Sequence, residues 1–320
     1  MAFSGFTLTE VRSMARLVLN GSRWYFLPLA AVSALTLSAA VAAQGPAAAG
    51  RIEVAKAGLM TPESMLHDEG ADVYLVSNIN GAPSAKDNNG FISRVSPDGK
   101  MAALKWIAGG QKGVTLHAPK GLGLHGETLY VSDIDCVRRF NRETGAPAGE
   151  TCIEGATFLN DLSVAPDGTI YVSDTGIRLD ESGMTATKTD AVYRIGRDQK
   201  PAALIKGPEL TNPTGVVALN GGVLLVPFGG AEVWHIDANG ARHTMGRMPA
   251  GQLDGLLRLE DGTILASSWE GQAVYRLAKG QTSAVLENVA SPADIGYDAK
   301  RKRLLVPVFT EDRLIVMDLR

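Results

Sequence analysis

The chain has 320 residues, of which 45% are hydrophobic and 20% are charged, as in an ordinary folded protein. A net charge of -3 and the lack of any basic stretch interleaved with aromatic residues argue against a nucleic-acid partner. The 36 glycines are spread among short apolar runs, a pattern that indicates a turn-rich all-β protein.

Residues 1–43 read as an export signal, with translation starting either at Met1 or at Met14. Arginines precede the apolar run 24–45, which ends in small residues of the kind that signal peptidases cleave. The same run is near the minimum length for an uncleaved membrane anchor, so that alternative stays open. We expect cleavage, which leaves no membrane span, a flexible linker at 44–50 and a periplasmic or secreted domain at 51–320.

Two cysteines, Cys136 and Cys152, flank the turn-like segment RETGAPAGE (142–150). Both would lie on one hairpin, and an exported protein can form disulfides. The sequence leaves two possibilities open, a Cys136–Cys152 disulfide or two buried free thiols.

A pattern of a short run, a turn and a stronger run occurs six times, with copies starting roughly 40 to 57 residues apart. Most copies continue into a third run and many into a fourth, as in the four-stranded units of a β-propeller. No amphipathic helix of adequate length separates the strands, which excludes an α/β fold. The copies are 61–78, 118–133, 159–174, 212–228, 253–269 and 291–309.

The sixth copy ends at Arg320 with only three strands. Residues 51–57 can supply the missing outer strand by pairing with 313–319, which closes the ring and removes an exposed edge. The sequence therefore predicts one monomeric six-bladed β-propeller over 51–320.

The first strand of each copy should line the propeller axis, and the residue at its entrance should point inwards. Carboxylate and amide oxygens at this position suit a divalent cation, most simply Ca²⁺. Two alternatives are a wet polar tunnel and an ion-paired plug in which Lys120 neutralises Glu63 and Asp254 without metal. The six entrance residues are Glu63, Lys120, Asn160, Thr214, Asp254 and Ala293.

The ends of the second runs should form a further layer on the same face, polar in the first three copies and apolar in the last three. Such a cavity suits a small organic ligand with a polar reacting group. Asp133 and Asp174 have a simpler interpretation as turn caps. Two insertions, 78–90 and 174–190, are either lids over the mouth of the propeller or surface loops without a function. The expected substrate contacts are Asn78, Asp174, Phe228 and Trp269, together with Lys120 and Asn160.

Four short motifs give the chain a resemblance to a known family: an early Glu at Glu63, LNDLSVAPDG (159–168), NPTGV (212–216) and LDGLLRLEDG (253–262). Over roughly 58–320 the chain resembles the senescence-marker-protein/gluconolactonase family of six-bladed propellers, which are related to strictosidine-synthase-like proteins and paraoxonases.

The resemblance implies that Glu63 and Asp254 ligate a divalent metal and that Asn160 is a ligand or a substrate contact. Thr214 stands where the family has Asn, which weakens the expected site, and Asn212 lies two residues earlier.

The implied activity is metal-dependent hydrolysis of a lactone or ester, with Asp254 as the base. No G-x-S-x-G, H-E-x-x-H or P-loop motif points to other chemistry. The alternative is a non-catalytic propeller that binds a small ligand or a partner protein, because YVSD (130–133) followed by VRRF (137–140) is similar to NHL-type repeats.

Overall fold

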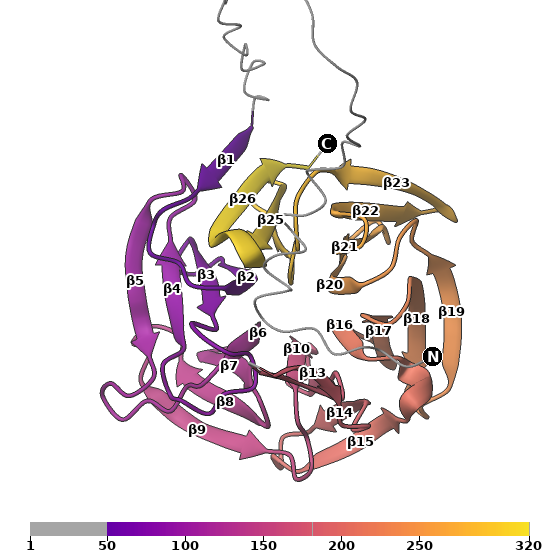
Figure 1. Cartoon of the computed structure of the whole chain (residues 1–320), viewed down its shortest axis with the longest axis horizontal. Helices are drawn as coiled ribbons and strands as arrows, with labels where there is room; N and C mark the ends of the chain where they lie inside the picture. Colours follow the sequence, from indigo (N-terminus) through magenta and orange to yellow (C-terminus); the bar gives the residue numbers. More distant parts are fainter. Residues whose placement is uncertain (1–49, 181, 320) are drawn as a thin grey trace, which may run out of the picture.

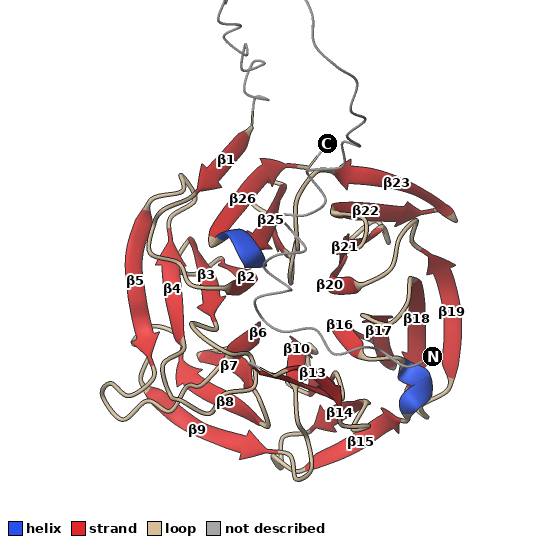
Figure 2. Ribbon diagram, in the orientation of Figure 1, coloured by secondary structure: helices blue, strands red, loops and turns tan. Residues whose placement is uncertain are grey.

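Six four-stranded antiparallel sheets surround a common axis, like the blades of a propeller (Figure 1). The structure, a computed structural model, describes residues 50–180 and 182–319. Within these residues the secondary structure is strand apart from the two short 3₁₀ helices η1 (Pro208–Leu210) and η2 (Phe309–Glu311), drawn blue in Figure 2. Neither helix is long and apolar enough to cross a bilayer.

Each blade runs from an innermost strand at the axis to an outer strand at the rim. The first blade contains β2 (Pro62–Asp68), β3 (Val73–Asn78), β4 (Phe91–Val95) and β5 (Met101–Ala108). The second contains β6 (Pro119–His125), β7 (Thr128–Asp133), β8 (Cys136–Asn141) and β9 (Pro147–Cys152). The third contains β10 (Leu159–Val164), β11 (Ile170–Asp174), β14 (Ala191–Ile195) and β15 (Pro201–Lys206).

The remaining blades follow the same order. The fourth contains β16 (Pro213–Leu219), β17 (Gly222–Pro227), β18 (Glu232–Asp237) and β19 (Arg242–Arg247). The fifth contains β20 (Leu253–Arg258), β21 (Ile264–Ser268), β22 (Ala273–Ala278) and β23 (Gln281–Leu286). The sixth contains β24 (Gly296–Asp298), β25 (Arg303–Val308), β26 (Arg313–Asp318) and β1 (Arg51–Val54).

The sixth blade is built from both ends of the described chain. β1 pairs antiparallel with β26, with Arg51 opposite Met317 and Val54 opposite Leu314. The closure predicted from the sequence is therefore confirmed, although the closing strand ends at Val54. The predicted signal, and the linker up to residue 49, lie outside the described residues.

The core lies between neighbouring blades. Leu75 and Ile92 of the first blade, for example, pack with Leu129 and Phe140 of the second. These side chains are at most 2% exposed, and burying such a residue contributes about 1.5–3 kcal/mol. Each blade is therefore stabilised mainly by its two neighbours.

A serine just before the end of the second strand connects one blade to the next. Its hydroxyl donates to the backbone carbonyl at the entrance of the next blade's innermost strand, from Ser132 to Asn160, from Ser173 to Thr214 and from Ser267 to Ala293. The serine of the VSD and ASS motifs thus has a structural role, since a buried carbonyl needs a hydrogen-bond donor.

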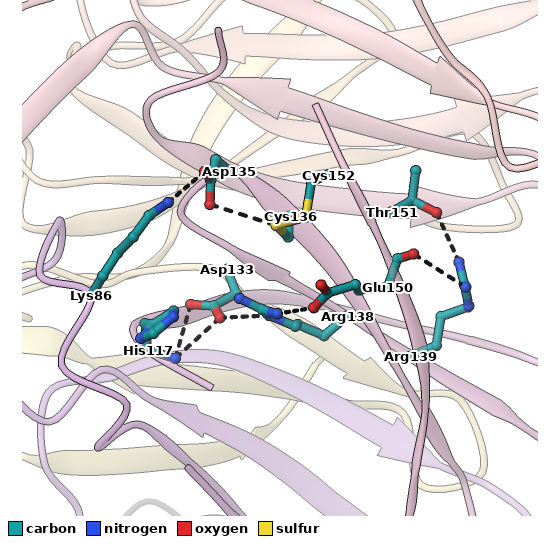
Figure 3. The surroundings of a disulfide bond; sticks show 10 residues. All are labelled: Lys86, His117, Asp133, Asp135, Cys136, Arg138, Arg139, Glu150, Thr151 and Cys152. Carbon is teal, nitrogen blue, oxygen red and sulfur yellow. Dashed lines mark hydrogen bonds and ion pairs between the residues drawn. A yellow bond between two sulfur atoms is a disulfide. The ribbon is translucent and has the colours of Figure 1, made fainter. Parts of the chain in front are cut away.

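The cysteines form a disulfide between directly opposed residues of β8 and β9, as one of the two sequence interpretations proposed (Figure 3). A disulfide that closes a loop of this length stabilises a fold by about 3 kcal/mol in the loop-entropy model.

Candidate functional site

The site lies where the innermost strands begin, on the face that we call the upper face. The first five innermost strands each have a register shift just after their entrance, for example between Pro62 and Met65 of β2 and between Leu253 and Leu256 of β20. A bulge of this kind re-aims the residues within it. The entrance residues Glu63, Lys120, Asn160, Thr214 and Asp254 fall in these bulges, and each is at most 6% exposed.

The position after the entrance residue is crowded by the neighbouring innermost strand. A Cβ on Gly121 would lie 2.6 Å from the backbone nitrogen of Leu162, and one on Gly255 would lie 2.3 Å from that of Ile295. The glycine of the family-like DG motif is therefore required for close packing of adjacent strands.

Two buried acceptor atoms at the entrance positions have no hydrogen-bond partner, Oε2 of Glu63 and Oδ1 of Asn160. Burial raises the pKa of Glu63 well above its ordinary value, and the nearby carboxylate of Asp254 raises it further. Buried acceptors normally have a partner, so these two atoms indicate a missing cation or ligand donor.

Asp254 is held in place by an aromatic side chain. Its Oδ2 accepts a hydrogen bond of 3.0 Å from Nε1 of Trp269. Burial raises the pKa of Asp254 to about 7, against the lowering effect of this bond. A carboxyl group with such a pKa can take up and release a proton near neutral pH.

Two further buried carboxylates, Asp161 and Asp294, lie next to the entrance positions. Asp161 accepts from the backbone N–H of Val216 at 2.7 Å, and Asp294 accepts from Oγ of Ser64 at 2.5 Å. Burial raises both pKa values, that of Asp294 to about 7, and both charges raise the pKa of Glu63. The sequence reasoning took one residue per copy and missed them, although both stand directly after an entrance residue.

The amine of Lys120 points towards the upper-face loops and not to a carboxylate. It donates to the carbonyls of Pro83 and Ala118, both at 3.0 Å, and lies 4.3 Å from the ring centroid of Phe158. Within residues 50–180 and 182–319 it forms no ion pair shorter than 4.0 Å. Burial lowers its pKa to about 8, against the raising effect of Glu63. Lys120 therefore balances the axial charge only from a distance.

The hydroxyl of Thr214 lies between two backbone carbonyls, 2.8 Å from Leu253 and 3.1 Å from Val226. The hydroxyl hydrogen of Thr214 therefore joins the fourth blade to the fifth through the carbonyl of Leu253. The amide nitrogen of Asn212 donates to the carbonyl of Thr175 at 2.9 Å.

Asn78 and Asp174, two of the expected substrate contacts, are fully buried. Asp174 accepts from the backbone N–H groups of Phe158 and Gly176, and Asn78 accepts from that of Met60. These bonds support the turn-cap interpretation, and neither side chain is exposed to a ligand in this structure.

Phe228 and Trp269 lie together as the sequence suggested. Their ring centroids are 5.6 Å apart, and those of Trp269 and Phe309 are 5.1 Å apart. All three are half-buried, and Phe309 also packs on a small apolar group that includes Ile79 and Ile134. An apolar wall therefore runs from the fourth blade to the first.

The two insertions contact each other. The second forms a hairpin of β12 (Ile177–Asp180) and β13 (Gly183–Ala186) (Figure 1). The N–H of Ser84 donates to the carbonyl of Leu179, and the N–H of Leu179 donates to Oγ of Ser84. We call this pair, residues 79–90 and the β12–β13 hairpin, the double loop.

The donor set fits a hard cation, with two carboxylates and a free amide oxygen. Around the axis, within the described residues, no three ligand atoms of His, Cys, Asp or Glu lie within 4.8 Å of one another. In the part of the chain that the structure describes, the group that meets this distance is Cys136, Glu150 and Cys152, which contains the two disulfide sulfurs and cannot serve as a metal site. A cation at the axis would therefore depend on Asn160 and on water.

A broad depression of about 520 Å³ on the opposite face is lined by residues that include Arg301 and Arg303. Their guanidinium groups are already paired with Asp298 and Asp318. This depression therefore offers no free charge for a ligand.

No family model matches the chain, and no curated protein matches its sequence. A proposed gluconolactonase matches it in structure with a TM-score of 0.62, at 21% identity over 85% of this chain and 93% of its own. A gluconolactonase from Xanthomonas campestris matches with a TM-score of 0.66, at 17% identity over 84% and 89%. Virginiamycin B lyase from Staphylococcus aureus matches with a TM-score of 0.58, at 14% identity over 84% and 99%.

The chain thus has the six-bladed β-propeller fold that it shares with gluconolactonases, which confirms the fold predicted from the sequence. At these identities the likeness concerns the fold alone.

Proposed function

We propose that the chain is a divalent-metal-dependent hydrolase of a lactone or ester that acts outside the cytoplasm. The observation that carries the proposal is the pair of buried acceptors without partners, Oε2 of Glu63 and Oδ1 of Asn160, beside Asp254. The gluconolactonases among the structural neighbours favour the same chemistry.

Glu63, Asp254 and Asn160 would hold the cation, most simply Ca²⁺. When bound, it would polarise the substrate carbonyl and lower the pKa of a bound water. Asp254 takes the proton of the attacking water while the new C–O bond forms. The bond between the carbonyl carbon and the leaving oxygen, which is the ring oxygen of a lactone, then breaks, and that oxygen takes the proton from Asp254. The product is a hydroxy acid from a lactone, or an acid and an alcohol from an ester. Trp269 keeps Asp254 oriented through its N–H.

The test is a calcium and magnesium titration of thermal stability, followed by assays on a panel of sugar and alkyl lactones. We expect a cation-dependent rise in the unfolding temperature and lactone hydrolysis that a chelator abolishes. A protein that responds to neither cation and hydrolyses no lactone would contradict the proposal.

A second candidate is a non-catalytic propeller that binds a small ligand. It is favoured by the absence, in the described part of the chain, of three converging acidic ligand atoms around the axis. If the protein binds a lactone of the same panel but hydrolyses none of them, this second function is favoured.

The export signal at 1–43 belongs to the proposal as well. The intact mass of the exported protein tests it, and a mass that retains residues 14–43 would contradict cleavage.

A further inference from the structure

The upper face has two halves that differ in chemistry. The double loop covers the half over the first three blades, and the aromatic wall of Phe228, Trp269 and Phe309 forms the other half. The two halves determine what kind of molecule can lie above the axial carboxylates.

Apart from three buried acceptor atoms, Oε2 of Glu63, Oδ1 of Asn89 and Oδ1 of Asn160, the polar groups that border the axis in the first half are bonded within the protein. The amine of Lys120 donates to two carbonyls, one of them Pro83 in the double loop. Asp133 accepts from the N–H groups of His117 and Ala118 and from Arg138. Figure 3 shows the bonds from His117 and Arg138. With Asn78 and Asp174 also buried and bonded, this half has few groups left to replace the water around a sugar hydroxyl.

A polyhydroxylated ligand would therefore lose the hydration of several hydroxyl groups and gain few protein hydrogen bonds in return. Such uncompensated desolvation opposes binding. The half-buried aromatic wall has the opposite preference, because it gains by covering hydrocarbon.

Trp269 connects the wall to the site. Its ring packs on Phe228 and Phe309, while its N–H holds Asp254. A ligand whose carbonyl reaches Asp254 therefore places its neighbouring substituent against the wall.

We propose that the substrate is a lactone or ester with a hydrocarbon substituent, bound on Phe228, Trp269 and Phe309, and not a sugar lactone. This inference rests on the proposed function, because it assigns the substrate class of that same site.

The experiment compares γ-butyrolactone, γ-caprolactone, γ-nonalactone and glucono-δ-lactone in the wild type, Phe228→Ala and Phe228→Leu. We expect kcat/KM to rise with alkyl length and glucono-δ-lactone to be the poorest substrate. Phe228→Ala should raise KM about tenfold for γ-nonalactone and by a much smaller factor for γ-butyrolactone, which has no alkyl substituent to place on the wall. Phe228→Leu, which keeps a large apolar side chain, should restore most of the loss.

Trp106→Ala is the matched control, because this aromatic lies on the outer strand β5, away from the upper face. It should leave KM unchanged for every lactone. Thermal unfolding of each variant checks that the propeller is intact.

A preference for glucono-δ-lactone, or an equal effect of Phe228→Ala on all four lactones, would overturn the inference and leave the proposed function standing. If no lactone is hydrolysed, the proposed function fails, and thermal shifts with γ-nonalactone then decide whether the wall binds alkyl lactones. The absence of such a shift would overturn the inference too.

Discussion

Two sets of buried carboxylates lie at the upper ends of the strands of this propeller and have opposite environments. Asp133 and Asp174, at the ends of second strands, are fully buried and receive two or more hydrogen bonds each. Glu63 and Asp254, at the entrances of first strands, are nearly as buried, yet Oε2 of Glu63 has no partner and Asp254 has one side-chain donor.

The difference in hydrogen-bond partners separates carboxylates with a structural role from carboxylates that are available to a ligand. A carboxylate with a full set of donors lowers the energy of the fold that it caps, whereas one left without donors is destabilising until something binds. All four side chains are buried carboxylates, so it is their hydrogen-bond partners that distinguish the two sets.

The largest effect of a substitution should come from removing a fully bonded carboxylate. Asp133→Ala leaves two backbone N–H groups and Nε of the buried Arg138 without their acceptor, so we expect a loss of about 3 kcal/mol in the free energy of unfolding. Denaturant unfolding measures it. Asp135→Ala is the control, because its carboxylate pairs with the exposed Lys86 and its loss should cost less than about 1 kcal/mol. Equal losses would break the comparison.

Asp254→Asn tests the other set. Without cation, the variant should be at least as stable as the wild type, because it removes a buried carboxylate that lacks a full set of donors. In calcium at one hundred times the dissociation constant, the wild type should gain about 2.7 kcal/mol and the variant nothing. Thermal shifts with and without calcium measure both, and a variant with the full wild-type response would exclude Asp254 as a ligand.

The metal-free protein should lose stability as the pH rises. Burial raises the pKa of Asp294 from its ordinary value of 3.8 to about 7, so the folded state keeps a proton that the unfolded state releases. The resulting stabilisation is complete below about pH 4 and lost as the pH rises through about 7, with a total of at most about 4 kcal/mol. Stability measured in chelator should fall over this range, and less so in Asp294→Asn. A variant with the same slope as the wild type would refute the assignment.

The smallest effect should come from Lys120→Met, roughly 1 kcal/mol, because the loss of two hydrogen bonds is offset by the removal of a buried charge. Amide exchange in residues 79–90 should become faster, since Pro83 loses its donor. Lys112→Met, on an exposed loop, should change neither quantity. If the variant instead acquires a new calcium response, Lys120 is the counter-ion of the axial carboxylates.

The fold was predictable because each blade repeats one pattern of strands and turns. The six copies predicted a ring of six blades, and the incomplete sixth copy predicted that the two ends of the domain pair. The shared hairpin placed Cys136 next to Cys152. Each of these follows from local periodicity and chain connectivity.

The site was predictable only in part. The common register placed Glu63, Asn160 and Asp254 at equivalent entrances. Alternation along a strand gives no sign that the bulge of β10 brings Asp161 against the fourth blade, or that Asp294, just before β24, bonds to Ser64 of the first blade. The direction of Lys120 depends on where the double loop lies, which is tertiary information.

The pairing of β1 with β26 also has a consequence for the order of events in folding. Ring closure joins segments at opposite ends of the described chain, so it is the contact of longest sequence separation and cannot form until the last strand has emerged. Until β1 pairs with it, β26 presents an unpaired edge, which is a template for a strand from another molecule. Removing residues 51–54 would make that transient edge permanent, and the protein would then be expected to self-associate through its sixth blade.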